Sequence, residues 1–188
     1  MATGILRLFG FRIEGEIPAV SRCVAIVAPH TSNWDFPLCI FAMFAIGLRL
    51  TFLGKHTLFR FPVTGLLRWF GGEPLDRSAA SGQVRTAITR FAAHKPWILG
   101  VSPEGTRKRV EPWKLGFYRI AVGAGVPIVT VSLDYSRRLF TIAEPFWPTH
   151  NERDDLRVLQ SRFSKEMALY PEKFAETGLT AAVPLNTA

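Results

Sequence analysis

The sequence is short of cysteine, of long apolar runs and, in its middle third, of acidic residues. Its only two cysteines, Cys23 and Cys39, both lie in apolar stretches, which predicts small buried side chains in a reducing compartment rather than a disulfide. The longest apolar run, Phe36–Leu48, has 13 residues, well below the roughly 20 that span a bilayer. Basic residues interrupt the apolar ones in the first 18 residues, so we expect no secretory signal.

Acidic residues are scarce only in the middle of the chain. The 188 residues carry a formal net charge of +8, yet residues 49–119 hold 13 lysines and arginines against four acidic residues, which gives +9. The flanking stretches, 1–48 and 120–188, sum to −1. A concentrated basic field attracts the phosphates of nucleic acid, of anionic lipid or of a phosphorylated small substrate. Charge alone does not choose among these partners.

Residues 1–15 combine apolar and basic side chains. The apolar ones are Ile5, Leu6, Leu8, Phe9 and Phe11, and they stand beside Arg7 and Arg12. Such a segment suits an anchor that lies in a membrane interface. It equally suits a cap on the hydrophobic core, and the sequence leaves both interpretations open.

The length and the 48% hydrophobic content predict one domain over residues 1–188. Apolar runs predict strands at Cys23–Ala28, Leu50–Leu53, Trp97–Val101, Ile128–Leu133 and Leu139–Ala143. Amphipathic spacing predicts helices at 33–47, 81–95, 117–122 and 156–170. Strands that alternate with helices predict an α/β fold, a single layered domain with a largely parallel or mixed central sheet flanked by helices. Residues 177–188 are expected to form a loose tail.

A histidine follows the first predicted strand directly. His30 stands two residues after Ala28, and Asp35 follows after four more residues, near the start of the next predicted helix. Residues five apart on a regular helix point about 140° away from each other, so the pair can meet only if His30 lies in the preceding turn. A carboxylate beside one imidazole nitrogen leaves the other free to take a proton from a hydroxyl.

A structural interpretation of Asp35 is also open. It stands three residues after Ser32, where an acid stabilises a helix N-terminus through a capping-box bond and the helix dipole.

The loop after the third predicted strand is polar and basic. It contains Glu104, Gly105 and Thr106, followed by three consecutive cations that begin at Arg107. Glycine lets backbone approach a ligand, and arginine suits bidentate contact with phosphate. Taken alone, the same residues also describe a solvated basic turn.

Together the two loops resemble the lysophospholipid and 1-acylglycerol-3-phosphate acyltransferases, which are marked by H-x4-D and later E-G-T-R motifs. The motifs are His30/Asp35 and Glu104–Arg107, with 68 residues between Asp35 and Glu104. Further similar blocks are Lys55 after Phe-Leu-Gly, the stretch 71–77 that ends in Asp-Arg, and the stretches 114–116 and 126–129. The family's second block is matched only loosely, by Leu58–Pro62, and the resemblance covers about residues 20–135.

The resemblance implies acyl transfer from acyl-CoA or an acyl carrier protein to a hydroxyl of a lysophospholipid-like acceptor. His30 would be the general base and Asp35 would orient it. Glu104, Gly105 and Thr106 would shape the acceptor site. The cations that would bind phosphate are Arg107, Lys55, Arg60 and Arg77. No cofactor or metal is implied, and the protein is expected on the cytoplasmic face of the cell membrane, bound peripherally to anionic lipid.

Two rival functions remain as alternatives. A serine-type lipid hydrolase is suggested by Gly100-Val101-Ser102-Pro103-Glu104, although Glu104 replaces the second glycine of G-x-S-x-G. A nucleic-acid-binding domain is suggested by the pI of about 10.1, although the sequence has none of the common RNA- or DNA-binding signatures, so no nucleic-acid partner is expected. The four histidines show no metal-ligand spacing.

Overall fold

The computed structural model of the chain describes residues 2–75, 80–105 and 113–175. Three of the predicted site residues, Arg77, Thr106 and Arg107, lie outside the described residues, as does the tail predicted at 177–188. Within the described ranges, no helix is long and apolar enough to span a membrane.

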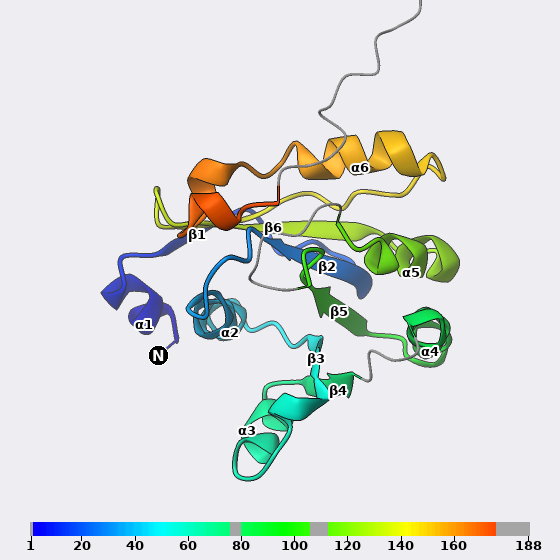
Figure 1. The fold of residues 1–188 in the computed structure, drawn as a ribbon, viewed down its shortest axis with the longest axis horizontal. Helices are drawn as coiled ribbons and strands as arrows, with labels where there is room; N and C mark the ends of the chain where they lie inside the picture. Colours follow the sequence, from blue (N-terminus) through cyan, green and yellow to red (C-terminus); the bar gives the residue numbers. More distant parts are fainter. Residues whose placement is uncertain (1, 76–79, 106–112, 176–188) are drawn as a thin grey trace, which may run out of the picture.

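A seven-stranded sheet forms the centre of the molecule (Figure 1). Its strands lie in the order β1-β7-β6-β2-β5-β3-β4. Their bounds are β1 Arg12–Glu14, β2 Arg22–Ala28, β3 Thr51–Lys55, β4 Gly72–Leu75, β5 Trp97–Val101, β6 Ile128–Asp134 and β7 Leu139–Ile142. Every neighbouring pair is parallel except β6 and β7, which are antiparallel. The predicted α/β class with a largely parallel, mixed sheet is therefore confirmed.

Helices cover both faces of this sheet. Their bounds are α1 Ala2–Leu8, α2 Asp35–Ala45, α3 Val63–Trp69, α4 Ala80–Ala93, α5 Gly116–Ala124 and α6 Glu152–Gln160. Helices α1 and α2 lie on one side of the sheet and α4 and α5 on the other, while α3 projects beyond β3 and β4 (Figure 1).

Strand β2 shows how the sequence supplies apolar side chains to both faces of the sheet. Successive side chains of a strand point to opposite faces. Val24, Ile26 and Ala28 are fully buried in one core cluster, which also contains apolar residues of α4, α5 and α6. The alternate positions of β2 face the side of α2. An unbroken apolar run is what a strand covered on both faces requires.

The N-terminal segment contributes to the core. Leu6 and Phe11 are buried in a cluster with residues of α2, β6 and β7, so these two side chains pack as the cap interpretation expects. Leu8 and Phe9 of the same segment are exposed.

The late helix is shorter than its periodicity predicts. The spacing of apolar residues predicted a helix over 156–170, but α6 ends at Gln160 and two 3₁₀ turns, Lys165–Met167 and Pro171–Lys173, follow. The chain is extended at Ser164, and the carbonyl of Met167 accepts a hydrogen bond from the backbone N–H of Tyr135. Contacts with the strand-end loops thus override the helical pattern, a common limit of local propensity.

The segment between β3 and β4 contains α3, although the sequence analysis predicts no helix there. A Cβ on Gly72 would lie 2.7 Å from the carbonyl oxygen of Leu67, so the backbone of α3 approaches β4 closely only because residue 72 is glycine. Pro74 lies in β4, which is an edge strand of the sheet, where a missing N–H is tolerated.

Candidate active site

The loops that leave the parallel strands meet at one edge of the sheet. β2 is parallel to both β5 and β6, so their carboxyl ends lie together, as ligand sites in open α/β sheets require. His30 follows β2, Glu104 follows β5 and Tyr135 follows β6. His30 and Glu104 are more than 70 positions apart in the chain, and Glu104 and Tyr135 are more than 30 positions apart.

His30 and Asp35 face each other across the start of α2. His30 lies in the loop before the helix and Asp35 is the first helical residue, which is the arrangement that the sequence predicts for a meeting pair. Nδ1 of His30 lies 3.2 Å from Oδ2 of Asp35. Asp35 is fully buried, whereas the His30 side chain keeps 18% of its surface exposed. The imidazole therefore lies between a buried carboxylate and solvent.

The hydrogen bond that the capping interpretation of Asp35 predicts is also present, although the N-cap residue of α2 is Trp34 and its side chain makes no capping hydrogen bond. Oδ2 of Asp35 accepts a hydrogen bond of 2.8 Å from the backbone N–H of Ser32, and the Ser32 hydroxyl accepts one from the N–H of Trp34. These bonds fold residues 32–35 into a tight turn and fix the carboxylate beside the imidazole. The two interpretations are therefore compatible, because one side chain serves both the helix start and the histidine.

Tyr135 is a site residue that the sequence analysis missed. Its hydroxyl donates a 2.6 Å hydrogen bond to Oδ1 of Asp35. Burial, together with the neighbouring Asp35 carboxylate, raises the pKa of Tyr135 above its ordinary value, so the phenol stays a donor. Tyr135 directly follows β6, and the rule that sites form at strand ends would have indicated it.

Removing this phenol should slow catalysis without changing substrate affinity. Hydrogen bonds to charged groups contribute about 1.5 to 3 kcal/mol, so we expect Tyr135→Phe to lower kcat at least about tenfold with KM for both substrates unchanged. Tyr118→Phe is a matched control, because Tyr118 donates in the same way, at 2.7 Å, to the carboxylate of Asp155 away from the site. Equal kcat losses in both variants would show that Tyr135 acts only through general stability.

Glu104 holds the backbone of the His30 loop. Its carboxylate is buried, and both of its oxygens accept from the N–H of His30, at 3.1 and 3.2 Å. Burial raises the pKa of Glu104 from its ordinary value of 4.5 to about 7, since a charged carboxylate is poorly solvated there. The first residue of the Glu-Gly-Thr-Arg motif thus positions the first residue of the His-x4-Asp motif.

This raised pKa predicts how stability depends on pH. The folded chain binds the Glu104 proton more tightly than the unfolded chain, so its contribution is complete below pH 4.5 and is lost as the pH rises to about 7. We expect Glu104→Gln to remove this dependence, with a change on the order of 1 to 3 kcal/mol across the window. Chemical denaturation of both proteins from pH 4.5 to 8 checks this. A stability difference that stays constant over this range would contradict the assignment.

Gly105 and Lys114 lie together beside Glu104. Gly105 has a φ of +65°, which favours glycine, and a Cβ there would lie 3.0 Å from Nζ of Lys114. The backbone N–H of Lys114 donates to the carbonyl of Pro103. The Lys114 cation therefore lies next to the loop of Glu104 and Gly105. The sequence analysis had not assigned Lys114 to the site.

The remaining predicted site residues are not brought together by contacts in the described ranges. Lys55 ends β3, at the same edge of the sheet as His30. Arg60 is exposed in the turn before α3, and no contact of its side chain with His30, Asp35 or Glu104 is found among the described residues. Arg77, Thr106 and Arg107 fall outside those residues.

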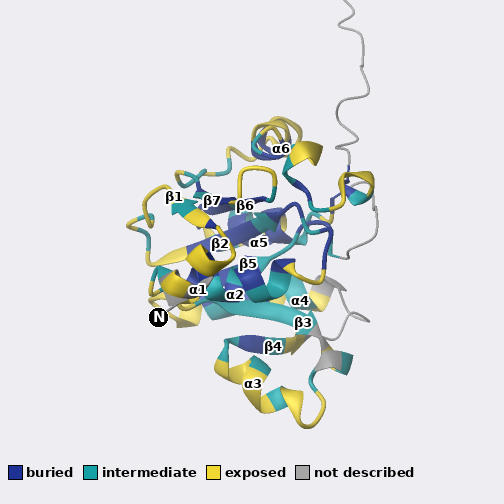
Figure 2. Cartoon of the chain, turned by 90° about the vertical axis from the view of Figure 1, so that its left-hand side faces the viewer, coloured by how far each residue is buried: buried dark blue, intermediate teal, exposed yellow. Residues whose placement is uncertain are grey.

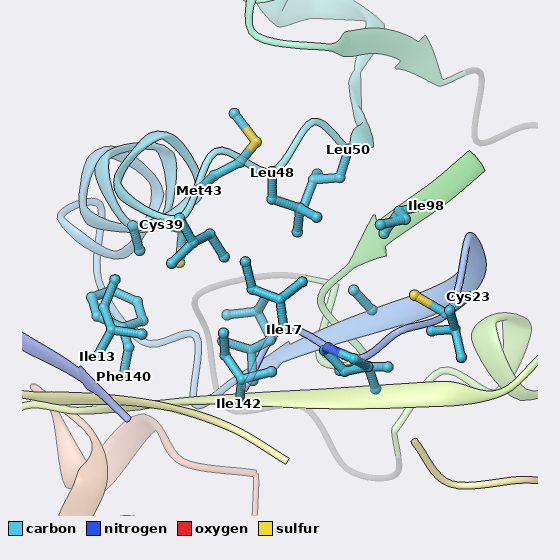
Figure 3. Close-up of a pocket in the computed structure, with 18 residues that line it drawn as sticks. Ile13, Ile17, Cys23, Cys39, Met43, Leu48, Leu50, Ile98, Phe140 and Ile142 are labelled. Atoms are coloured by element: carbon cyan, nitrogen blue, oxygen red, sulfur yellow. The ribbon is translucent and has the colours of Figure 1, made fainter. Parts of the chain in front are cut away.

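An apolar cavity of about 120 Å³ lies between α2 and the sheet (Figure 3). Strand β2 contributes Cys23, Ala25 and Val27, the positions that alternate with its core residues. Helix α2 contributes Cys39, Ala42 and Met43, and its C-cap residue Ile46 also lines the cavity. Cys23 and Cys39 are both free thiols, the first buried and the second partly buried. Burial raises the pKa of Cys23 to about 11, so the thiol lining the cavity is uncharged.

The cavity runs along the strand that leads to His30. Val27 stands three residues before His30, and Cys23 stands at the other end of the same strand face. The four steps from Cys23 to Val27, at about 3.3 Å each, make this lining about 13 Å long. An apolar space lined by the strand that leads to His30 is suited to a hydrocarbon chain attached to a reacting polar group.

Sequence comparisons relate the chain to known acyltransferases. Residues 11–134 match the family model described as Acyltransferase. The chain is 33% and 31% identical over 134 residues to the 1-acyl-sn-glycerol-3-phosphate acyltransferases of Escherichia coli and Haemophilus influenzae, matching 66% of this chain and 53% and 54% of theirs. It therefore spans about half the length of these curated relatives.

A solved structure shows the same fold. The crystal structure of the 1-acyl-sn-glycerophosphate acyltransferase PlsC from Thermotoga maritima aligns with a TM-score of 0.55 at 22% identity, covering 86% of this chain and 74% of that one. The family model covers more than half of the chain and includes His30, Asp35 and Glu104. The chain belongs to the acyltransferase family.

Proposed function

We propose that this chain transfers a fatty acyl group from a thioester donor to the free hydroxyl of a lysophospholipid, with lysophosphatidate as the first acceptor to test. The observation that carries the proposal is the His30–Asp35 pair, 3.2 Å apart, together with an apolar cavity whose β2 lining ends at Val27, three residues before His30. The relatives named as 1-acyl-sn-glycerol-3-phosphate acyltransferases support this acceptor class.

The proposed reaction needs no covalent enzyme intermediate. Nδ1 of His30 faces the Asp35 carboxylate, so Nε2 accepts the proton of the acceptor hydroxyl. The acceptor oxygen then attacks the thioester carbonyl carbon. As the new ester C–O bond forms, the C–S bond breaks, and the leaving thiolate takes the proton from His30. The buried Asp35 carboxylate stabilises the imidazolium between these two proton transfers.

Each part of the substrates has a matching part of the chain. The acyl chain fits the cavity under α2. The phosphate of the acceptor or of the donor meets the basic field of residues 49–119, to which we assign Lys55, Arg60, Arg77 and Arg107. Acyl-CoA and acyl carrier protein remain the two donors to compare, and the chain is proposed to act at the cytoplasmic surface of an anionic membrane.

The hydrolase alternative lacks a base. Among the described residues, Oγ of Ser102 is buried without a hydrogen-bond partner, whereas a serine nucleophile requires an adjacent general base.

The first experiment measures acyl transfer by the purified chain from acyl-CoA and from acyl carrier protein to lysophosphatidate, lysophosphatidylcholine and glycerol 3-phosphate. We expect the highest rate with lysophosphatidate and none for His30→Ala. Equal rates for His30→Ala and the wild type would refute the proposed mechanism.

A further inference from the structure

Helix α3 presents apolar side chains to solvent. Phe61, Leu66 and Trp69 are 97%, 54% and 72% exposed, and no residue of the helix is buried. Figure 2 shows α3 at the lower end of the molecule, largely coloured as exposed. Large apolar side chains that gather on one exposed element mark an interaction site more often than scattered ones do.

The apolar residues share one side of the helix. Val63, Leu66 and Trp69 are three positions apart, which places them in one row on a helix surface. The other side is fixed to the sheet, because the carbonyl of Leu67 lies against Gly72 of β4. Phe61 comes two residues before the helix and is also exposed. We call Phe61, Val63, Leu66 and Trp69 the α3 patch.

The surroundings of the α3 patch are basic. The stretch 49–72 contains four basic residues and no acidic residue. Arg60 and Arg68, one on the preceding turn and one on the helix, are exposed. Apolar side chains flanked by cations are the composition of segments that lie in an anionic lipid surface, and each cation contributes about 1 kcal/mol there.

The size of the patch also favours lipid over a protein partner. Seven helical residues extend only about 10 Å, whereas a stable protein interface uses about 20 to 30 residues on each side. A bilayer accepts a small convex element, because a few apolar side chains can enter it without a complementary surface. Tryptophan in particular is enriched where membrane and water meet.

We propose that the α3 patch inserts into the headgroup region of an anionic bilayer, with Arg68 on a lipid phosphate. This contact does not depend on the reaction that the chain catalyses. It differs from the membrane anchor that the sequence leaves open as one of two interpretations of residues 1–15, where Leu6 and Phe11 pack inside the core.

The patch also connects to the cavity. The ring of Trp69 packs against Phe44 of α2, with centroids 5.6 Å apart, and Ile46, Leu48 and Leu50, just after Phe44, line the cavity. Insertion of α3 therefore brings this side of the cavity close to lipid. The consequence, that lipid substrates reach the cavity from the bilayer, rests on the proposed function.

The test compares matched pairs of substitutions in vesicle sedimentation. Phe61→Ser with Leu66→Ser removes exposed patch side chains that make no ring contact with any residue that the structure describes, so the fold should be retained. Trp147→Ser with Val158→Ser is the control, since these residues are also exposed but lie outside α3. With vesicles of phosphatidylcholine and phosphatidylglycerol, we expect the patch variant to bind at least about tenfold more weakly and the control to bind normally. Binding by the wild type should weaken with salt.

Three outcomes would overturn the proposal. One is vesicle binding by the patch variant that equals the wild type. Another is loss of binding only in Leu8→Ser with Phe9→Ser, which would assign the contact to the N-terminal segment. The third is a wild-type dimer that the patch substitutions convert to monomer, without an effect on vesicle binding, which would make α3 a contact between copies. Because sedimentation does not use the acyl-transfer reaction, an inactive chain that binds vesicles through α3 would contradict the proposed function alone.

Discussion

Asp35→Asn should lower the rate of acyl transfer by about 10² to 10⁴-fold in the folded protein, as loss of the charged partner does in other His-Asp pairs. Asparagine keeps the size of the side chain but not its charge. Three donors now face the Asp35 carboxylate, from Ser32, His30 and Tyr135. The NH₂ group of asparagine is itself a donor, so one of these three would lose its acceptor. The imidazolium formed during the reaction would then have no counter-charge.

The same substitution should also reduce stability, which makes the control important. A capping acid on an exposed helix end contributes about 0.3 to 1 kcal/mol, but Asp35 is fully buried and accepts from Ser32 and Tyr135, so a loss of about 1 to 3 kcal/mol is expected. Thermal unfolding must therefore accompany each rate measurement. Rates refer to the folded fraction only.

A double-mutant comparison separates catalysis from capping. Residues that act as a unit give non-additive losses, so His30→Ala with Asp35→Asn should be little slower than His30→Ala alone. If Asp35 served only the helix start, the losses would instead multiply. A folded Asp35→Asn protein that retained more than about a third of the wild-type rate would contradict the catalytic assignment, because general-base catalysis contributes at least about 10²-fold.

The His30–Asp35 geometry was predictable because it is local. A strand, a short turn and a helix start occupy residues 22–35, and the turn is closed by the bond from Ser32 to Asp35. Sequence patterns contain such short-range information. The largely parallel direction of the strands was predictable for a similar reason, since strands and helices alternate along the chain.

Other parts of the site depend on contacts between distant residues. Tyr135 lies 100 positions after Asp35, and only the parallel pairing of β2 with β6 brings the two together. The bond between Glu104 and the backbone of His30 spans 74 positions. The support that Glu104 gives to the His30 loop therefore depends on how the sheet is assembled, and neither sequence motif alone reveals it.

The α3 patch shows a different limit. An apolar segment between glycines and prolines is as consistent with a buried loop as with an exposed helix, because burial depends on what packs against it. In the structure, only the Leu67 side of α3 approaches β4. Periodicity failed in the opposite way for α6, where regular spacing continued beyond the end of the helix.

The cavity provides the second large expected effect, a change in acyl-chain selectivity. Ala25 lies in the middle of the β2 lining, and Cys23 lies two residues farther from His30, which is about 7 Å along a strand. Leucine at either position should shorten the space available to the acyl chain. Ala25→Leu should do so closer to the reacting group.

We therefore expect a graded result from these two variants. Ala25→Leu should slow transfer from long-chain donors by about 10- to 200-fold, the range for a few methylenes in an apolar pocket, and leave short-chain donors unaffected. Cys23→Leu should spare intermediate chain lengths as well. Transfer rates with a series of acyl thioesters measure this, and thermal unfolding monitors overpacking, which costs about 1 to 3 kcal/mol where space is insufficient. Equal slowing at every chain length would show that the cavity under α2 does not hold the acyl chain, because a blocked end of the cavity affects only chains long enough to reach it.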